Sequence, residues 1–220
     1  MINKAVHLFF PGPFGGAEQV ILTGLERLKD IYPIELWIVQ EQRVPQHAEY
    51  FTKEVKRLNI PYKTFTAKGI FDLNLIKEMK NCLDSSPILH AHGLKASFYS
   101  YLAKKQSPLI ITHHGDTSHT FKVRLYELIQ RFIMKRASSV IAVSNQMKSD
   151  LQIKNIKSEV IENLLSKEIE IIQDKENNNT QKFVVIGRLS PEKGINVLIR
   201  ALSEVDDFKL VVIGLSLIHI

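Results

Sequence analysis

Short apolar runs alternate with amphipathic stretches along most of the chain. The apolar runs are rich in Val and Ile and nearly continuous in hydrophobic character, which is typical of strands buried on both faces of a parallel sheet. Helical periodicity lies between them, most clearly near residues 20–28, 73–83 and 120–136. The pattern predicts an α/β fold with a doubly wound parallel sheet. The expected strands are Ala5–Phe10, Ile34–Gln40, Tyr62–Phe65, Ile88–Ala91, Leu109–Thr112, Ser139–Val143 and Val160–Glu162.

This alternation stops at a polar stretch, residues 167–182, which contains an Asn run and has the composition of a linker. A strand at Phe183–Gly187, a loop and helix at Ser190–Leu202 and a strand at Lys209–Ile213 follow it as one βαβ unit. We therefore expect three parts: an N-terminal domain over 1–166, a linker over 167–182, and the start of a second domain over 183–220.

One βαβ unit does not bury both faces of its own sheet, because a parallel sheet needs further strands and covering helices. The pattern therefore predicts that the second domain is cut short. The final segment, Leu215–Ile220, follows Gly214 where a turn is expected, which suggests that it is not native sequence. A natural short apolar terminus is the alternative.

Composition narrows the class of protein. Hydrophobic residues make up 45% and charged residues 24% of the chain, as in soluble globular proteins. The single cysteine, Cys82, excludes a disulfide framework and indicates a reducing compartment. No apolar run approaches the roughly 20 residues that span a bilayer, so we expect a cytoplasmic protein. The net charge of +6 favours anionic partners, but no zinc-spaced Cys/His set and no aromatic-basic interleaving predict nucleic-acid binding.

Two strand-to-helix loops have the composition of anion sites. Arg188 and Lys193 follow the strand that ends at Gly187, and two cations beside a helix N-terminus suit a diphosphate. Gly15 and Gly16 follow the first strand and leave backbone amides at the start of a helix. A solvated loop and a turn that needs glycine are the respective alternatives.

Histidine pairs end two of the predicted strands. His90 and His92 lie on one strand, and His113 and His114 end another, at the edge where open α/β sheets bind ligands. The spacing of His90 and His92 places both on one face and suits a metal, but no carboxylate or thiolate set completes a site. Asp116 follows directly and could orient a histidine or bind an acceptor hydroxyl. Packed core histidines and a turn aspartate are the alternatives.

The order of these motifs is similar to that of a known enzyme family. The segments GGAE, H-x-H-G, T-x-H-G, A-V-S and G-R-L-x-x-x-K-G resemble those of glycosyltransferase family 4, retaining enzymes of the GT-B fold. The resemblance covers nearly the whole chain, from Gly15 to about Gly214. It implies an acceptor-side, Rossmann-like domain followed by the first βαβ unit of the nucleotide-sugar domain.

The resemblance also implies a reaction and roles for residues. A hexose-type sugar would pass from a nucleotide-diphosphate sugar to an acceptor hydroxyl of a carbohydrate or lipid-linked acceptor, in polysaccharide or glycolipid biosynthesis. No metal or other cofactor is implied, because cations of the protein balance the diphosphate. The implied donor-phosphate residues are Arg188, Lys193, Gly15 and Gly16. The implied catalytic residues are His114, with His113 as the alternative register, and Asp116. The implied sugar or acceptor contacts are His92, Glu18 and Ser144, although helix-dipole stabilisation and N-capping also explain the last two.

The sequence departs from the family pattern after the last N-domain strand. Residues Glu162–Leu165 keep the asparagine of the common N-G-[VI]-D segment but not its glycine and aspartate. The acidic donor motif of the family is also missing, so we expect the chain to be inactive alone and to bind nucleotide sugar weakly.

Other functions compete with transfer. A GT-B-fold epimerase or phosphorylase and a non-catalytic anion-binding scaffold at a membrane are the alternatives, whereas the missing dinucleotide fingerprint disfavours a dehydrogenase. The basic amphipathic stretch 121–136 suits either peripheral contact with an anionic membrane or packing over the sheet.

Overall fold

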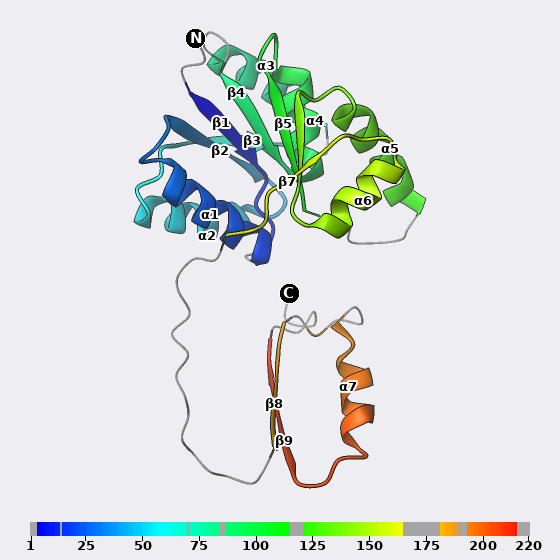
Figure 1. Ribbon diagram of the computed structural model, residues 1–220. Coiled ribbons are helices and arrows are strands. Elements are labelled where there is room, and N and C mark those ends of the chain that lie inside the picture. The colour runs from blue at the N-terminus through cyan, green and yellow to red at the C-terminus, as the bar shows by residue number, and fades with distance from the viewer. Residues whose placement is uncertain are drawn as a thin grey trace. The chain divides into compact units, whose positions relative to one another are not determined.

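The computed structural model describes residues 4–13, 15–69, 71–83, 87–114, 121–164, 181–187, 189 and 193–214, with side chains from residue 128 onward in the fifth helix. Contacts divide the chain into two compact units, Met1–Glu168 and Ile169–Ile220. Both are drawn in Figure 1. In the described part of the chain, no helix has the length and apolar character needed to cross a membrane.

A seven-stranded sheet forms the centre of the first unit, in the order β3-β2-β1-β4-β5-β6-β7. Every pairing is parallel, which confirms the predicted doubly wound sheet. The order changes direction at β1, whose neighbours are β2 and β4, and this is where such sheets bind ligands. The strands are β1 (Ala5–Phe9), β2 (Ile34–Glu41), β3 (Tyr62–Ala67), β4 (Ile88–His92), β5 (Leu109–His113), β6 (Ser139–Ala142) and β7 (Glu159–Val160).

Among the described residues of this unit, six helices connect these strands. Their bounds are α1 (Gly16–Leu28), α2 (Pro45–Arg57), α3 (Leu73–Cys82), α4 (Gly93–Ala103), α5 (Phe121–Met134) and α6 (Asn145–Ile153). Helices α1 and α2 pack on one face in a cluster that includes Leu25, Phe51 and Ile38. Helices α3, α4 and α5 contribute to a larger cluster on the other face, which includes Tyr99 and Ile133.

Strands β1 and β2 have alternate residues in the two clusters. Val6 and Leu8 of β1 belong to the larger cluster, whereas Ala5 and Phe9 belong to the smaller one. His7 shares the face of Ala5 and Phe9 by the same alternation and is only 4% exposed. A titratable side chain therefore lies inside the sheet packing, next to the point where the strand order reverses.

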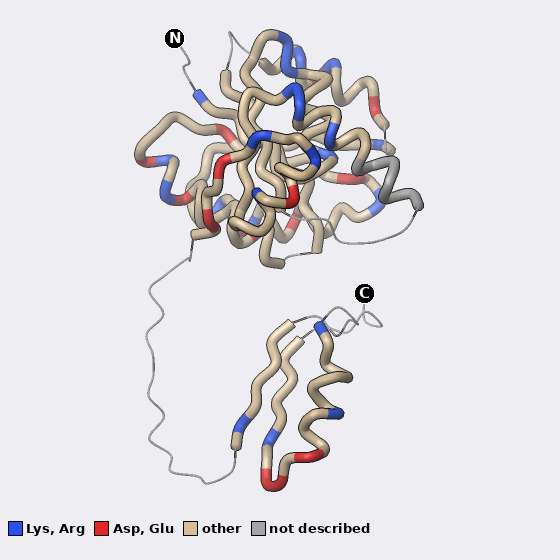
Figure 2. Tube along the Cα trace, turned by 45° about the vertical axis from the view of Figure 1, so that its right-hand side comes forward, with Lys and Arg blue, Asp and Glu red and all other residues tan. Residues whose placement is uncertain are grey.

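The second unit contains a parallel pair of strands, β8 (Gln181–Ile186) and β9 (Phe208–Ile213), joined through helix α7 (Ile195–Leu202). This arrangement confirms the predicted βαβ unit. Several of its apolar side chains are exposed, among them Val184, Ile186 and Val197. Lysines and arginines are interspersed with acidic residues over the first unit in the view of Figure 2.

Candidate functional site

A cavity of about 890 Å³ opens at the carboxyl end of the sheet, where β1, β2 and β4 meet their helices. Its volume lies within the usual range for small-molecule sites. The lining residues come from the strand ends, the loop after β1 and the first turns of α4, which is the expected place for a ligand site in a doubly wound fold.

Aromatic rings form much of the cavity wall. Phe10 and Tyr99 lie with ring centroids 5.2 Å apart, and Phe98 meets Phe71 edge-on at 5.9 Å. The Tyr99 hydroxyl accepts the amide hydrogen of Asp72 at 2.9 Å, which holds its ring in place. The cavity therefore offers a preformed, largely apolar surface to a ligand.

Polar groups enter this apolar wall at two places. Lys95 of α4 and Glu41 at the end of β2 form an ion pair of 2.6 Å, and both line the cavity. On the sheet side the lining includes His92, the last residue of β4, and His114, which follows β5. These two predicted site residues are therefore brought together by the fold.

The rings of His92 and His114 lie with centroids 5.9 Å apart. His92 Nδ1 and His114 Nε2 are buried, and neither has a hydrogen-bond partner among the described residues. Burial holds the pKa of His92 well below its ordinary value, helped by the positive charge that His90 and His7 would carry. Burial and the neighbouring His113 also lower the pKa of His114. Both rings are therefore neutral near pH 7, and each has one buried ring nitrogen without a partner among the described residues.

The adjacent histidine, His113, points to the opposite face of the sheet. Gln130 of α5 lies with Nε2 at 3.3 Å from His113 Nδ1, and both side chains are buried. His113 instead lines a second, smaller cavity of about 430 Å³ beside α6. Of the two registers considered, His114 is thus the one that shares a cavity with His92.

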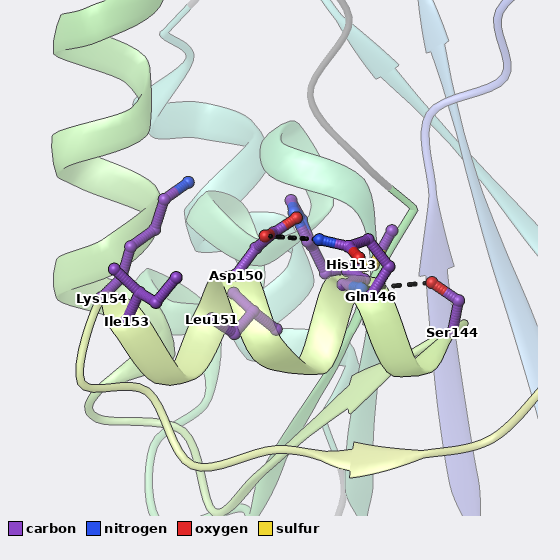
Figure 3. A pocket seen from close by; sticks show the side chains of 8 residues that line it. His113, Ser144, Gln146, Asp150, Leu151, Ile153 and Lys154 are labelled. Carbon is purple, nitrogen blue, oxygen red and sulfur yellow. Dashed lines mark hydrogen bonds between the residues drawn. The ribbon is translucent and has the colours of Figure 1, made fainter.

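Ser144 also lines this second cavity, as Figure 3 shows. Its hydroxyl accepts the amide hydrogen of Met147 at 3.2 Å and caps α6. Gln146 and Asp150 form a further hydrogen bond of 3.1 Å along the helix. Ser144 therefore lines a different cavity from His92 and His114, and a sugar contact by Ser144 stays a prediction.

Glu18 is 5% exposed and lies beneath the loop that follows β1. Its two carboxylate oxygens accept the amide hydrogens of Gly12 at 2.9 Å and Gly15 at 3.0 Å. The carboxylate thus fixes the loop and occupies the Gly15 amide, while Gly16 begins the helix and is exposed. Phosphate binding by Gly15 and Gly16 and an acceptor contact by Glu18 stay predictions.

In the second unit, Lys193 lies over the end of β8. A Cβ atom at Gly187 would stand 3.4 Å from Lys193 Cε, so the lysine stem packs against the glycine. Gly187 has φ +150° and Gly194, the N-cap of α7, has φ +62°, both of which favour glycine. Lys193 is therefore held at the N-terminus of α7. Arg188 and Asp116 lie outside the described residues.

Sequence reasoning missed that His7 and Thr112 contact the histidines of β4. His7 Nδ1 lies 3.2 Å from His92 Nε2, and His90 Nε2 lies 2.7 Å from Thr112 Oγ1. The only signal for His7 is a polar residue within an apolar strand. Its neighbours follow from the pairing of β1 with β4, where His7 stands opposite His90.

Comparisons with known proteins agree with the fold and with the glycosyltransferase family. An uncharacterized glycosyltransferase of Methanocaldococcus jannaschii is 30% identical over 214 residues, which cover 90% of this chain and 56% of that protein. The chain thus spans little more than half the length of this curated relative.

Solved structures give the same fold. Anabaena HepE, crystallised with UDP and glucose, superposes with a TM-score of 0.72 at 19% identity over 98% of this chain and 62% of its own. A glycosyltransferase of Rickettsia africae gives 0.67 at 21% identity over 97% and 60%. The profile of Glycosyltransferase Family 4 matches residues 14–165. The chain belongs to glycosyltransferase family 4 and has the GT-B type of Rossmann-like fold.

Proposed function

We propose that the protein to which this chain belongs transfers a sugar, of hexose type, from a nucleotide-diphosphate donor to an acceptor hydroxyl and retains the anomeric configuration. The observation that carries this proposal is the pair His92 and His114, whose neutral, partly unsatisfied rings line an apolar cavity at the strand ends of a family-4 protein. On this proposal residues 1–166 bind the acceptor, 167–182 link the domains, and 183–220 begin the donor side.

The donor is assigned to the second unit. Lys193 stands at the N-terminus of α7, where an ammonium and free helix amides both favour a diphosphate. Arg188, one residue after Gly187, would supply a second cation. A related fold, Anabaena HepE, was crystallised with UDP and glucose, which supports a nucleotide sugar as the donor. We propose that these two cations, rather than a metal, balance the charge on the leaving nucleotide.

The acceptor is assigned to the cavity of the first unit. Rings of Phe10, Phe71, Phe98 and Tyr99 suit an acceptor with an apolar portion, such as a lipid-linked sugar. His114 would then meet the reacting hydroxyl. This reading supports a role in glycolipid or polysaccharide synthesis at the cytoplasmic side of a membrane.

Donor binding can be tested directly on the chain. Saturation-transfer NMR with a panel of nucleotide-diphosphate sugars should give signals from nucleotide and sugar protons. Lys193→Ala and Arg188→Ala should weaken these signals. Lys209→Ala is the matched control, because Lys209 is an exposed cation at the opposite end of the same strand pair.

Equal binding by all three variants would contradict the donor assignment. Retention is tested separately, by NMR of the anomeric configuration of the product formed by the active enzyme. Inversion, or conversion of the nucleotide sugar in the absence of an acceptor, would contradict the proposed reaction.

A further inference from the structure

We propose that His7, His90 and His92 form a binding site for a late first-row divalent metal ion, with Zn²⁺ as the representative ion. The three side chains come from adjacent strands β1 and β4 and share one face of the sheet. Each offers a ring nitrogen, and these three atoms lie within 4.8 Å of one another. Imidazole nitrogens in such a set suit Zn²⁺, Cu²⁺, Ni²⁺ or Co²⁺ rather than Mg²⁺ or Ca²⁺.

The spacing of the rings fits one tetrahedral ion. His7 Nδ1 and His92 Nε2 lie 3.2 Å apart. Two nitrogens bound to one zinc ion at about 2.0–2.1 Å in tetrahedral geometry lie about 3.3 Å apart. A metal ion would therefore take the place of the shared hydrogen, which moves to the other nitrogen of the same ring, and each ring would turn slightly to aim its lone pair at the ion. The third nitrogen lies within 4.8 Å of the other two, so the His90 ring must move closer for all three nitrogens to bind one ion.

His90 is oriented by a neighbour in the manner of metal-binding histidines. Its Nε2 lies 2.7 Å from Thr112 Oγ1 on β5. When Nε2 donates its hydrogen to the threonine hydroxyl, Nδ1 keeps its lone pair for an ion. Such a second contact fixes the ring orientation and the tautomer of a histidine ligand.

Packing of the sheet does not explain why three histidines, rather than apolar residues, stand at these positions. With one proton shared between His7 Nδ1 and His92 Nε2, either His7 Nε2 or His92 Nδ1 must carry a hydrogen. Both atoms are buried and have no partner among the described residues. An unsatisfied buried donor is unfavourable, and an apolar residue at position 7 would avoid it.

The cluster is connected to the substrate cavity through His92, which belongs to both. Three histidine ligands leave one position of a tetrahedral ion for water or another oxygen. An ion at this position would lie in the acceptor unit, far along the chain from Lys193 and Arg188. The proposal therefore does not depend on the donor assignment.

The test is a metal titration of the chain, purified without a polyhistidine tag and freed of metal with a chelator. Calorimetry should show one Zn²⁺ per chain, and Co²⁺ should give the intense visible absorption of a four-coordinate ion. Mg²⁺ and Ca²⁺ should not bind. His7→Phe and His92→Phe keep a ring of similar size, and each should weaken Zn²⁺ binding at least about tenfold. His47→Phe removes a histidine outside the cluster and should leave the affinity unchanged.

Loss of folding in a variant would be recognised by circular dichroism in the chelator. A measurement on the unaltered chain then decides: in long-range ¹H–¹⁵N spectra, Zn²⁺ should shift the ring nitrogens of these three histidines. The absence of Zn²⁺ binding, or shifts confined to other histidines such as His113 and His114, would overturn the proposal.

Discussion

The imidazole rings of His92 and His114 lie with centroids 5.9 Å apart and planes inclined by 28°, side by side on the floor of the aromatic cavity. His92 ends β4 and His114 directly follows the adjacent parallel strand β5, so both rings are positioned by the sheet. Burial keeps both rings neutral near pH 7. Two neutral rings at one strand edge can orient a sugar hydroxyl without adding charge to the apolar cavity.

Replacement of His114 tests its place at the reacting centre. His114→Ala should lower the turnover of the active enzyme about 10²–10³-fold, the usual cost of removing one group that contacts the transition state. Donor binding, measured by saturation-transfer NMR, should hardly change, because Lys193 and Arg188 lie in the other unit.

His113→Asn is the matched control for this variant, because His113 faces Gln130 on the other side of the sheet. It should lower the free energy of unfolding by about 1–2 kcal/mol but leave the turnover per folded molecule within a few-fold. If instead His113→Asn lowered turnover strongly and His114→Ala did not, the catalytic assignment would move to His113.

The pH dependence of stability follows from burial of His7. Its pKa is lowered to about 4, whereas an unfolded histidine titrates near 6.5. Between these values the unfolded chain binds more protons, so stability is fully present above about pH 6.5 and is lost as the pH falls toward 4. The shift corresponds to about 3 kcal/mol.

Fluorescence of Trp37, the single tryptophan and fully buried in the sheet, reports unfolding of the first unit. Urea titrations from pH 7 to pH 4, made in the presence of a chelator, should show that the free energy of unfolding decreases as the pH falls. In His7→Gln the loss should be smaller by about 3 kcal/mol. Identical pH profiles for the two proteins would show that His7 is protonated in the folded state as easily as in the unfolded state.

The strands and the shared face of His90 and His92 could be predicted because a period of two needs only local sequence. The partnership of His7 with His90 could not, since it depends on the pairing of β1 with β4. Helix α4 was not among the predicted helices. Its buried side chains include Ala96, Ser97 and Ser100, which are too small or polar to form a visible apolar stripe.

The loop after β1 also has contacts that local sequence does not predict. The sequence GGAE indicates a helix start, but it does not show which amides the carboxylate of Glu18 binds. That choice depends on how the chain turns between Gly12 and Gly15. Local pattern therefore predicts the element and its chemistry, whereas three-dimensional contact decides the partner.

Removal of the Glu18 carboxylate should loosen this loop. Glu18→Ala leaves the amides of Gly12 and Gly15 without their acceptor and should cost about 3 kcal/mol of unfolding free energy. Glu18→Gln keeps one acceptor oxygen and should cost about half as much. Glu26→Ala, on the exposed side of the same helix, should change stability by less than about 0.5 kcal/mol. Urea unfolding followed by Trp37 fluorescence measures all three, and equal values for Glu18→Ala and Glu26→Ala would contradict the bonds described.

The aromatic wall predicts a preference among acceptors. Phe71 is 55% exposed, lines the cavity and meets Phe98 edge-on, so its ring is available to a ligand but contributes little to the core. Phe71→Ala should therefore weaken binding of an acceptor that carries a short alkyl chain about tenfold, with almost no loss of stability. A sugar acceptor without the chain should bind equally well to both proteins, because it makes no contact that the ring provides. Phe132→Ala is the control in detergent-free solution, since Phe132 is 49% exposed on α5 but does not line this cavity. Calorimetry with the two acceptors separates the outcomes: a parallel loss for both would indicate a general distortion of the cavity, and no loss for either would place the apolar part of the acceptor elsewhere.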